Sequence, residues 1–239
     1  HYPPPMDYFN HGDTAYKQHP EWRGEDREGN TTPRLSYTYP EFRAYAVSLL
    51  REMAERPIDG VCLLFNRRPP FLEYELPLVE GFKQAYGEDP LTLPANDPRW
   101  LAHRANTMTQ FMREVRAAMN SATEKRGSAK RIEVSAIVFG SEDENLQSGL
   151  NPREWVQEDL IDTLVAYSSA SELNSRVESW PKPEQQLRFH RDVVAETPCV
   201  LAANLFPRGM EAEDYRRHAD AIYKTGIDRL FIWDCTNSA

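Results

Sequence analysis

The sequence predicts an α/β protein whose parallel strands form a (β/α) barrel of the TIM type, with the first strands lacking from this chain. From residue 38 onward, short apolar runs alternate with segments of helical periodicity. The run at residues 58–66 is apolar on both faces, as a parallel strand covered by helices requires. No glycine-rich turn of the GxGxxG or GxxxxGK[ST] type follows any strand, which argues against a nucleotide-binding sheet and its cofactor.

The 239 residues are interpreted as one domain, either a barrel or a portion of one. Residues 1–37 carry much of the proline, glycine and charge without a sustained period, which predicts a long loop. The aromatic residues Tyr8, Phe9, Tyr16 and Trp22 indicate that this loop packs against another part of the protein. Residues 38–239 then supply about five βα units.

The first predicted helix covers residues 38–55. Thr38 and Glu41 have the spacing of a capping box, and apolar residues recur at helical intervals. We expect the face formed by these apolar residues to be buried: Phe42, Tyr45, Ala46, Leu49, Leu50 and Met53.

The remaining elements follow the same logic. A short helix at residues 78–86 ends at Gly87, and a long helix covers residues 98–123. The acidic residues Glu142, Asp143 and Glu144 are expected in a solvated loop. The predicted strands are residues 58–66, 131–139, 162–167, 199–206 and 229–234, and the later helices are residues 152–158, 184–196 and 211–225.

The predicted elements begin with a helix, contain five strands and end with the last of these strands. This order is compatible with two architectures. One is a small open doubly wound sheet of five strands. The other is a full barrel of eight strands, of which the first strands would precede residue 1. Both would place functional side chains beyond the carboxyl ends of the strands.

The composition excludes several classes of partner. The 28 basic and 37 acidic residues give a formal charge of −9, and no basic tract interleaves with aromatic residues, so nucleic acid is not an expected partner. No apolar run approaches the roughly 18 residues of a membrane span. Histidine and cysteine spacings predict no metal site, and the three cysteines are interpreted as buried free thiols.

Several short motifs occur in order along most of the chain: His19-Pro20-Glu21-Trp22, Arg34-Leu35-Ser36-Tyr37, Pro40-Glu41-Phe42-Arg43, Asp59-Gly60-Val61, Arg67-Arg68-Pro69, the segment TQFMREVR at 109–116, Gly149-Leu150-Asn151, Trp155 and Leu160-Ile161-Asp162. Together they resemble the bacterial glycosyl-hydrolase-like family-10 type of TIM barrel. The resemblance implies that residues 58–66 form barrel strand four and residues 229–234 strand eight. It also implies a poly- or oligosaccharide as the partner, and a secreted or periplasmic protein.

The chain departs from the pattern of the retaining glycosidase barrels. Those enzymes end strand four on an Asn-Glu pair and strand seven on a second Glu, whereas this chain has Asn66-Arg67 and Asn204-Leu205. Hydrolysis requires two carboxyl groups that flank the scissile bond. The usual pair of catalytic carboxylates is therefore not found at the ends of these two strands.

Other acidic residues near strand ends are the candidate catalytic groups. Glu73 and Glu75 lie in a mixed apolar and acidic loop, which could raise the pKa of one carboxyl group and make it a general acid. Asp234 ends the last predicted strand and is the candidate second carboxylate. The alternatives are a loop glutamate paired with Arg67 or Arg68, and an aspartate that caps a helix.

The candidate substrate-binding residues combine amides, guanidinium groups and indole rings. Amides bind hydroxyl groups, guanidinium groups bind an acidic sugar through two parallel hydrogen bonds, and indoles stack on sugar faces. These residues are Asn66, Arg67, Arg68, Asn204, Trp22 and Trp233. The sequence thus favours a glycoside hydrolase, with two rivals: a carbohydrate-binding barrel without catalysis, and a sugar lyase or isomerase.

Overall fold

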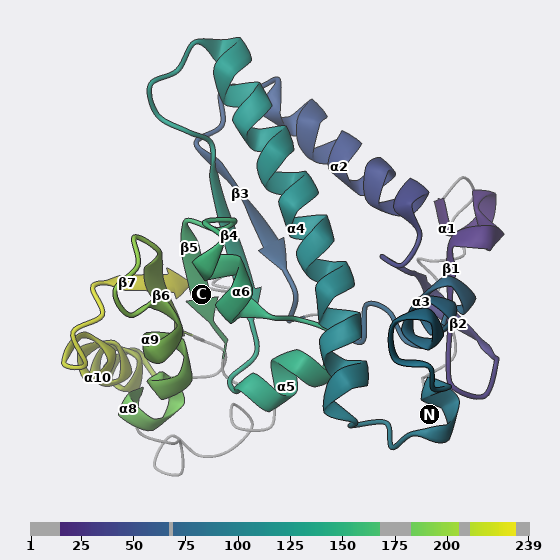
Figure 1. Ribbon diagram of the computed structural model, residues 1–239. Helices are drawn as coiled ribbons and strands as arrows, with labels where there is room; N and C mark the ends of the chain where they lie inside the picture. Colours follow the sequence, from purple (N-terminus) through teal and green to yellow (C-terminus); the bar gives the residue numbers. More distant parts are fainter. Residues whose placement is uncertain (1–14, 67–68, 168–182, 206–210, 233–239) are drawn as a thin grey trace.

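The computed structural model describes residues 15–66, 69–167, 183–205 and 211–232 (Figure 1). Two sheets are present in this part of the chain, one of two strands and one of five. The larger sheet consists of β3 (Gly60–Leu64), β4 (Glu133–Val138), β5 (Thr163–Ala166), β6 (Val200–Leu205) and β7 (Arg229–Ile232).

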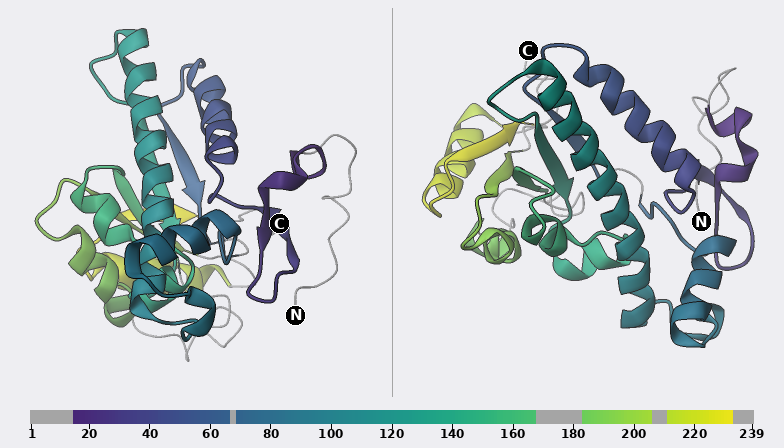
Figure 2. Two further views of the ribbon diagram at one scale, coloured as in Figure 1. Left: turned by 45° about the vertical axis from the view of Figure 1, so that its right-hand side comes forward. Right: turned by 45° about the horizontal axis from the view of Figure 1, so that its top comes forward.

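The five strands are all parallel and lie in the order of the sequence, β3-β4-β5-β6-β7. The sheet curls into half a barrel (Figures 1 and 2). A doubly wound sheet reverses its strand order at a switch point, and the described strands contain no reversal. The α/β class and the barrel-like winding are confirmed, and the doubly wound alternative is wrong for these strands.

Helices connect the strands and cover one side of the sheet. Glycines with positive φ end two of them: Gly87 at φ 70° and Gly127 at φ 61°, so the long helix extends three residues beyond its predicted end. The helices are α2 (Pro40–Ala54), α3 (Leu76–Tyr86), η3 (Pro90–Thr92), α4 (Pro98–Arg126), α5 (Glu142–Gln147), α6 (Pro152–Gln157), α8 (Pro183–Gln186), α9 (Arg188–Val194) and α10 (Ala212–Tyr223).

Successive side chains along each strand point to opposite faces of the sheet. Val134, Ala136 and Val138 of β4 point to the helix side and belong to the main apolar core together with residues of α4. Ile137, between them, belongs to a separate cluster with Val165, Tyr167 and Ala202 on the concave side, against which Phe231 also packs. Paired residues share a face because the strands are in register, Ile137 with Val165 and Val165 with Ala202.

The first strand and the first long helix are incompletely covered. Cys62 of β3 is exposed and Leu64 is 44% exposed. Tyr45, Leu49 and Met53, which follow each other along one face of α2, are 39–51% exposed. The expectations of buried thiols and of a buried face on this helix are therefore wrong at these positions. Val47 and Ala54 of α2, by contrast, are buried on the side that packs on α4.

The expected N-terminal loop is partly regular structure. Beside α1 (Ala15–Gln18) and η2 (Pro20–Trp22), β1 (Arg23–Glu25) pairs antiparallel with β2 (Thr31–Leu35). Asp26 closes the hairpin, because its Oδ1 accepts hydrogen bonds from the backbone N–H groups of Glu28 at 3.1 Å and Asn30 at 2.7 Å. This hairpin lies apart from the five-stranded sheet in all three views (Figures 1 and 2).

Two helix starts differ from the prediction. Tyr39 rather than Thr38 precedes α2 and makes no side-chain cap, so the capping box predicted there is wrong. A capping box does occur at α5, where the Ser141 hydroxyl accepts from the Glu144 N–H and the Glu144 carboxylate accepts from the Ser141 N–H. The acidic residues 142–144 thus begin a helix instead of forming a loop.

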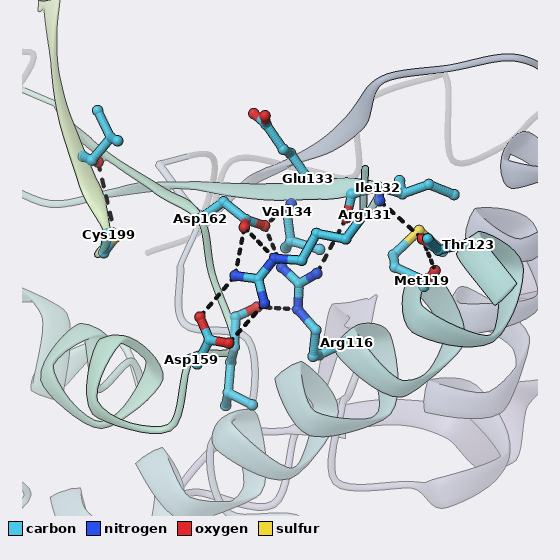
Figure 3. Close-up of polar contacts among 12 residues, drawn as sticks. Arg116, Met119, Thr123, Arg131, Ile132, Glu133, Val134, Asp159, Asp162 and Cys199 are labelled. Atoms are coloured by element: carbon cyan, nitrogen blue, oxygen red, sulfur yellow. Dashed lines mark hydrogen bonds and ion pairs between the residues drawn. The ribbon is translucent and has the colours of Figure 1, made fainter. Parts of the chain in front are cut away.

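A buried charge network holds the amino ends of β4 and β5 (Figure 3). Arg116 of α4 is 5% exposed and donates to the carbonyl oxygens of Leu160 and Ile132 and, at 2.5 Å, to the Asp162 carboxylate. Asp162 also accepts from Arg131 and from the backbone N–H of Val134. Every bond of this set joins α4 to the start of a strand or joins the strands to each other.

We expect Asp162→Asn to lower the free energy of unfolding by about 3 kcal/mol or more, because it leaves the buried Arg116 charge without its carboxylate. Asp159→Asn is the matched control: its side chain also binds Arg131 but is 55% exposed, and its loss should cost about 1 kcal/mol or less. Urea unfolding of both variants measures the difference. Equal losses would contradict a structural role specific to Asp162.

Candidate functional site

The carboxyl ends of the strands bring together side chains from distant parts of the sequence. Beyond the paired row of Leu64, Ile137, Val165 and Ala202, Tyr167 and Asn204 follow two residues later, directly after β5 and within β6, and Asn66 lies in the turn after β3. Asn204 pairs in register with Phe231 of β7. Both predicted asparagines thus lie at the carboxyl ends of strands, Asn204 within β6 and Asn66 in the turn just after β3.

Both asparagines have unsatisfied amide groups. Asn204 is 5% exposed, and neither its carboxamide nitrogen nor its oxygen has a hydrogen-bond partner; the same is true of the buried amide atoms of Asn66. An unsatisfied buried polar group costs about 1–3 kcal/mol. A ligand with hydroxyl groups at this edge would satisfy these amides.

Glu73 lies in a pocket of about 480 Å³ beyond the ends of β3 and β4. The pocket is walled by the loop after β3, the start of α4 and the end of α5, and it combines polar and apolar groups. Its lining residues are Pro69, Pro70, Glu73, Tyr74, Ala95, Asn96, Leu101, Arg104, Gln147 and Ser148.

Two lining residues of this pocket are buried polar groups. Arg104 is 6% exposed, and its Nη2 donates to the Leu72 carbonyl oxygen at 2.8 Å, which fixes the guanidinium group. Tyr74 is 9% exposed, and its hydroxyl has no hydrogen-bond partner. A charged donor and an unsatisfied hydroxyl therefore lie at the wall of a cavity that also contains a carboxylate.

Glu75 lies elsewhere. It is 1% exposed and does not line the Glu73 pocket; its carboxylate accepts from the Thr38 hydroxyl at 3.2 Å and from the Glu73 N–H at 2.9 Å. Burial raises the pKa of Glu75 although these hydrogen bonds act in the opposite direction. The Glu75 carboxylate joins the loop after β3 to the segment that follows the N-terminal hairpin.

The other predicted site residues divide into two groups. Trp22 is not at the strand ends: its ring stacks on His19 with centroids 3.6 Å apart and packs near Phe42 and Tyr45 of α2. The remaining residues lie outside the described part of the chain, so their roles stay predictions: Arg67, Arg68, Trp233 and Asp234.

Arg104, Tyr74, Gln147 at the end of α5 and Ser148 directly after it were not predicted as site residues. Arg104 carries a detectable signal, because it lies one turn before Met108 on the buried face of α4, where a charge is unusual. The sequence contains no signal that identifies Gln147 and Ser148 as site residues, because they line the pocket only through the packing of α5.

Comparison with protein-family models and with curated proteins finds no match to this chain. Within the described ranges, no three His, Cys, Asp or Glu residues are grouped closely enough to hold a metal ion. None of the helices in those ranges combines the length and the apolar character required to cross a membrane. The family resemblance therefore stays a prediction.

His190 fixes the end of β4 that borders this edge. The residue is 1% exposed on α9, and its Nε2 lies 2.9 Å from the Phe139 carbonyl oxygen, to which the ring N–H donates. Burial lowers the pKa of His190 from 6.5 to about 4. The folded protein therefore holds this imidazole neutral.

Because the unfolded chain binds this proton more readily, stability should fall as the pH drops from 6.5 to 4, by up to about 3 kcal/mol from His190 alone. His190→Asn should be less stable at pH 7 and show a flatter dependence over this interval. Urea unfolding at a series of pH values measures both slopes. Parallel slopes for the variant and the wild type would contradict this origin.

Proposed function

We propose that this chain is the C-terminal part of a (β/α)₈ barrel that binds and hydrolyses a poly- or oligosaccharide at its carboxyl edge. Glu73 is the proton donor in this proposal. Asp234 is the second carboxylate, and Asn66, Arg67, Arg68, Asn204 and Trp233 are substrate-binding residues. The observation that carries the proposal is the position of Glu73 in a pocket of mixed polar and apolar lining beyond β3 and β4.

The exposed residues at one edge of the half-barrel support the proposal that the complete protein forms a barrel. The five strands lie side by side in sequence order, as five consecutive strands of an eight-stranded closed barrel would. Leu64 and Cys62 on the concave side of β3, and Tyr45, Leu49 and Met53 on α2, lie at one edge of the sheet and are exposed. In a closed barrel a preceding strand and its helix cover these positions.

The carbohydrate part is supported by the chemistry of the groups around the edge. Sugar hydroxyls both donate and accept hydrogen bonds, and amides, hydroxyls and carboxylates supply the complementary groups. The Glu73 pocket offers Asn96, Gln147 and Ser148 in addition to Glu73 itself. The unsatisfied amides of Asn66 and Asn204 belong to the same carboxyl edge.

Catalysis would follow the two-carboxyl scheme. Glu73 would protonate the glycosidic oxygen of the leaving group, and Asp234 would act on the other side of the bond, either directly or through a water molecule. We favour Glu73 over Glu75 as the donor, because the Glu75 carboxylate is 1% exposed and occupied by hydrogen bonds to Thr38 and Glu73.

A second candidate function is carbohydrate binding without catalysis. Glu73 is the one carboxylate that lines its pocket among the described residues. A barrel that lacks a carboxylate pair could still hold a saccharide through the same amide and hydroxyl groups. Export of the protein, which the family resemblance implies, belongs to either proposal and is tested by cell fractionation.

We expect Glu73→Gln to lower the rate of glycan hydrolysis by about 10²–10⁴-fold while leaving saccharide affinity nearly unchanged, because the amide retains hydrogen bonds but cannot donate the proton. Release of reducing sugar measures the rate, and the product identifies a lyase or isomerase if one acts. Glu75→Gln is the control.

Retained hydrolysis in Glu73→Gln together with its loss in folded Glu75→Gln would transfer the donor role to Glu75. Saccharide binding by a wild-type chain that releases no product would favour the non-catalytic function. Absence of both binding and turnover would contradict the proposal as a whole.

A further inference from the structure

We infer that Glu75 is a positioning residue: it fixes the main chain at Glu73 and links this position to the N-terminal hairpin. The inference rests on the proposed function, because it concerns the proton donor assigned there. It depends on the contacts of a buried carboxylate and on the hydrogen bonds that hold residues 70–75. In this role Glu75 requires no contact with the saccharide.

The loop that carries Glu73 is held from the side of the hairpin by main-chain hydrogen bonds. The Tyr74 N–H donates at 2.9 Å to the carbonyl oxygen of Glu25, the last residue of β1. Two residues before Glu73, the Phe71 carbonyl oxygen accepts from the Tyr37 N–H at 3.4 Å. The Glu73 main chain therefore lies between two points at which the N-terminal segment binds the loop.

The peptide group that precedes the Glu73 Cα is bonded at both of its polar atoms. Its carbonyl oxygen, which belongs to Leu72, accepts from Arg104 Nη2 of α4 at 2.8 Å. Its N–H, which belongs to Glu73, donates to Glu75 Oε2 at 2.9 Å. Because a peptide group is planar, these two bonds fix its orientation and thus the direction in which the Glu73 side chain leaves the main chain.

The Glu75 carboxylate is itself held by the hairpin and by the segment that follows it. The Thr38 hydroxyl donates at 3.2 Å to Oε2, the oxygen that also accepts from the Glu73 N–H. Gly24 of β1 lies so close that a β carbon there would be 3.1 Å from Glu75 Oε1 and would overlap the Thr32 hydroxyl. A displacement of the hairpin would therefore move the carboxylate, and with it the peptide group at Glu73.

The burial of this carboxylate is unfavourable for stability. Glu75 is 1% exposed, and its hydrogen bonds come from neutral hydroxyl and main-chain donors. A carboxylate that is buried without a cation loses more hydration than neutral donors replace, and burial accordingly raises the pKa of Glu75. Such a group, bound to the main chain of the proposed donor, is typical of a functional site.

The first test measures hydrogen exchange of the Glu73 N–H by NMR in the whole chain. We expect Glu75→Ala and Gly24→Ala each to raise its exchange rate about tenfold or more, because they remove or displace the carboxylate that accepts from this N–H. Thr38→Val, which removes one hydroxyl, should raise the rate about two- to tenfold and decides the outcome if Glu75→Ala does not fold.

Thr225→Val is the matched control. Thr225 is 8% exposed and Thr38 is 7% exposed, and the Thr225 hydroxyl donates to the Ile222 carbonyl oxygen of α10 at 2.7 Å. The control thus removes an equally buried hydroxyl far from the loop in the sequence. It should leave the exchange rate of the Glu73 N–H unchanged.

The second test uses kinetics and rescue by a conservative variant, with soluble starch, laminarin and galactomannan as the probes. We expect Glu75→Ala to lower kcat about 10²-fold through misplacement of the donor, with KM changed by about twofold or less. Glu75→Gln should restore most of this loss, because its amide oxygen can still accept from the Glu73 N–H.

Unchanged exchange at Glu73 in Glu75→Ala and Thr38→Val would overturn the inference. So would a kcat that falls equally in Glu75→Gln and Glu75→Ala, because Glu75 would then act through its proton. If exchange changes as expected but the wild-type chain cleaves none of the probes, Glu75 does hold the Glu73 main chain, and the hydrolysis proposed above is contradicted.

Discussion

The contact between Arg116 and Asp162 is the interaction on which the arrangement of the carboxyl edge depends. A single guanidinium group on α4 binds the main chain before β4, the main chain before β5 and the carboxylate that follows it. Asp162 then binds the first residues of β4 through the Val134 N–H. Because parallel strands in fixed register end at fixed positions, the charges at one end of the sheet determine which side chains meet at the other. The buried charges stabilise one end, and the candidate site occupies the opposite end.

Much of the fold could be predicted because the relevant signals are local. Apolar runs, helical periodicity and the helix-ending glycines Gly87 and Gly127 predicted most of the strands and helices to within a few residues. The N-terminal hairpin could not be predicted in this way. Its strands are short and polar, and they form because each strand pairs with the other and because Asp26 closes the turn. The α5 helix was missed for a related reason, since its residues are acidic and its stability comes from the capping box at Ser141.

The candidate site could be predicted at its strand ends but not at its walls. Asn66 and Asn204 were predicted from their positions after apolar runs, and the structure places Asn204 within β6 and Asn66 just after β3, both with unsatisfied amide groups. Distinguishing Glu73 from Glu75 required the tertiary structure, because two residues of separation in a loop place one carboxylate in a pocket and the other against Thr38. Trp22 illustrates the opposite case. Its indole ring lies in a polar segment of the sequence, which suggested exposure to a ligand. In the structure the ring packs on His19 and on α2, next to the hairpin and away from the carboxyl edge.

The outer edge of β3 has a chemical consequence of its own. Among the described strands β3 has a neighbour on one side only, and its residues Gly60–Leu64 contain neither a proline nor a charged side chain. Free backbone N–H and C=O groups along such a strand accept any extended segment of matching length. A strand that completes the barrel and a strand from a second molecule would therefore compete for the same five residues. The outer edge of β3 is therefore the position at which this sheet would gain a further strand or associate with another molecule.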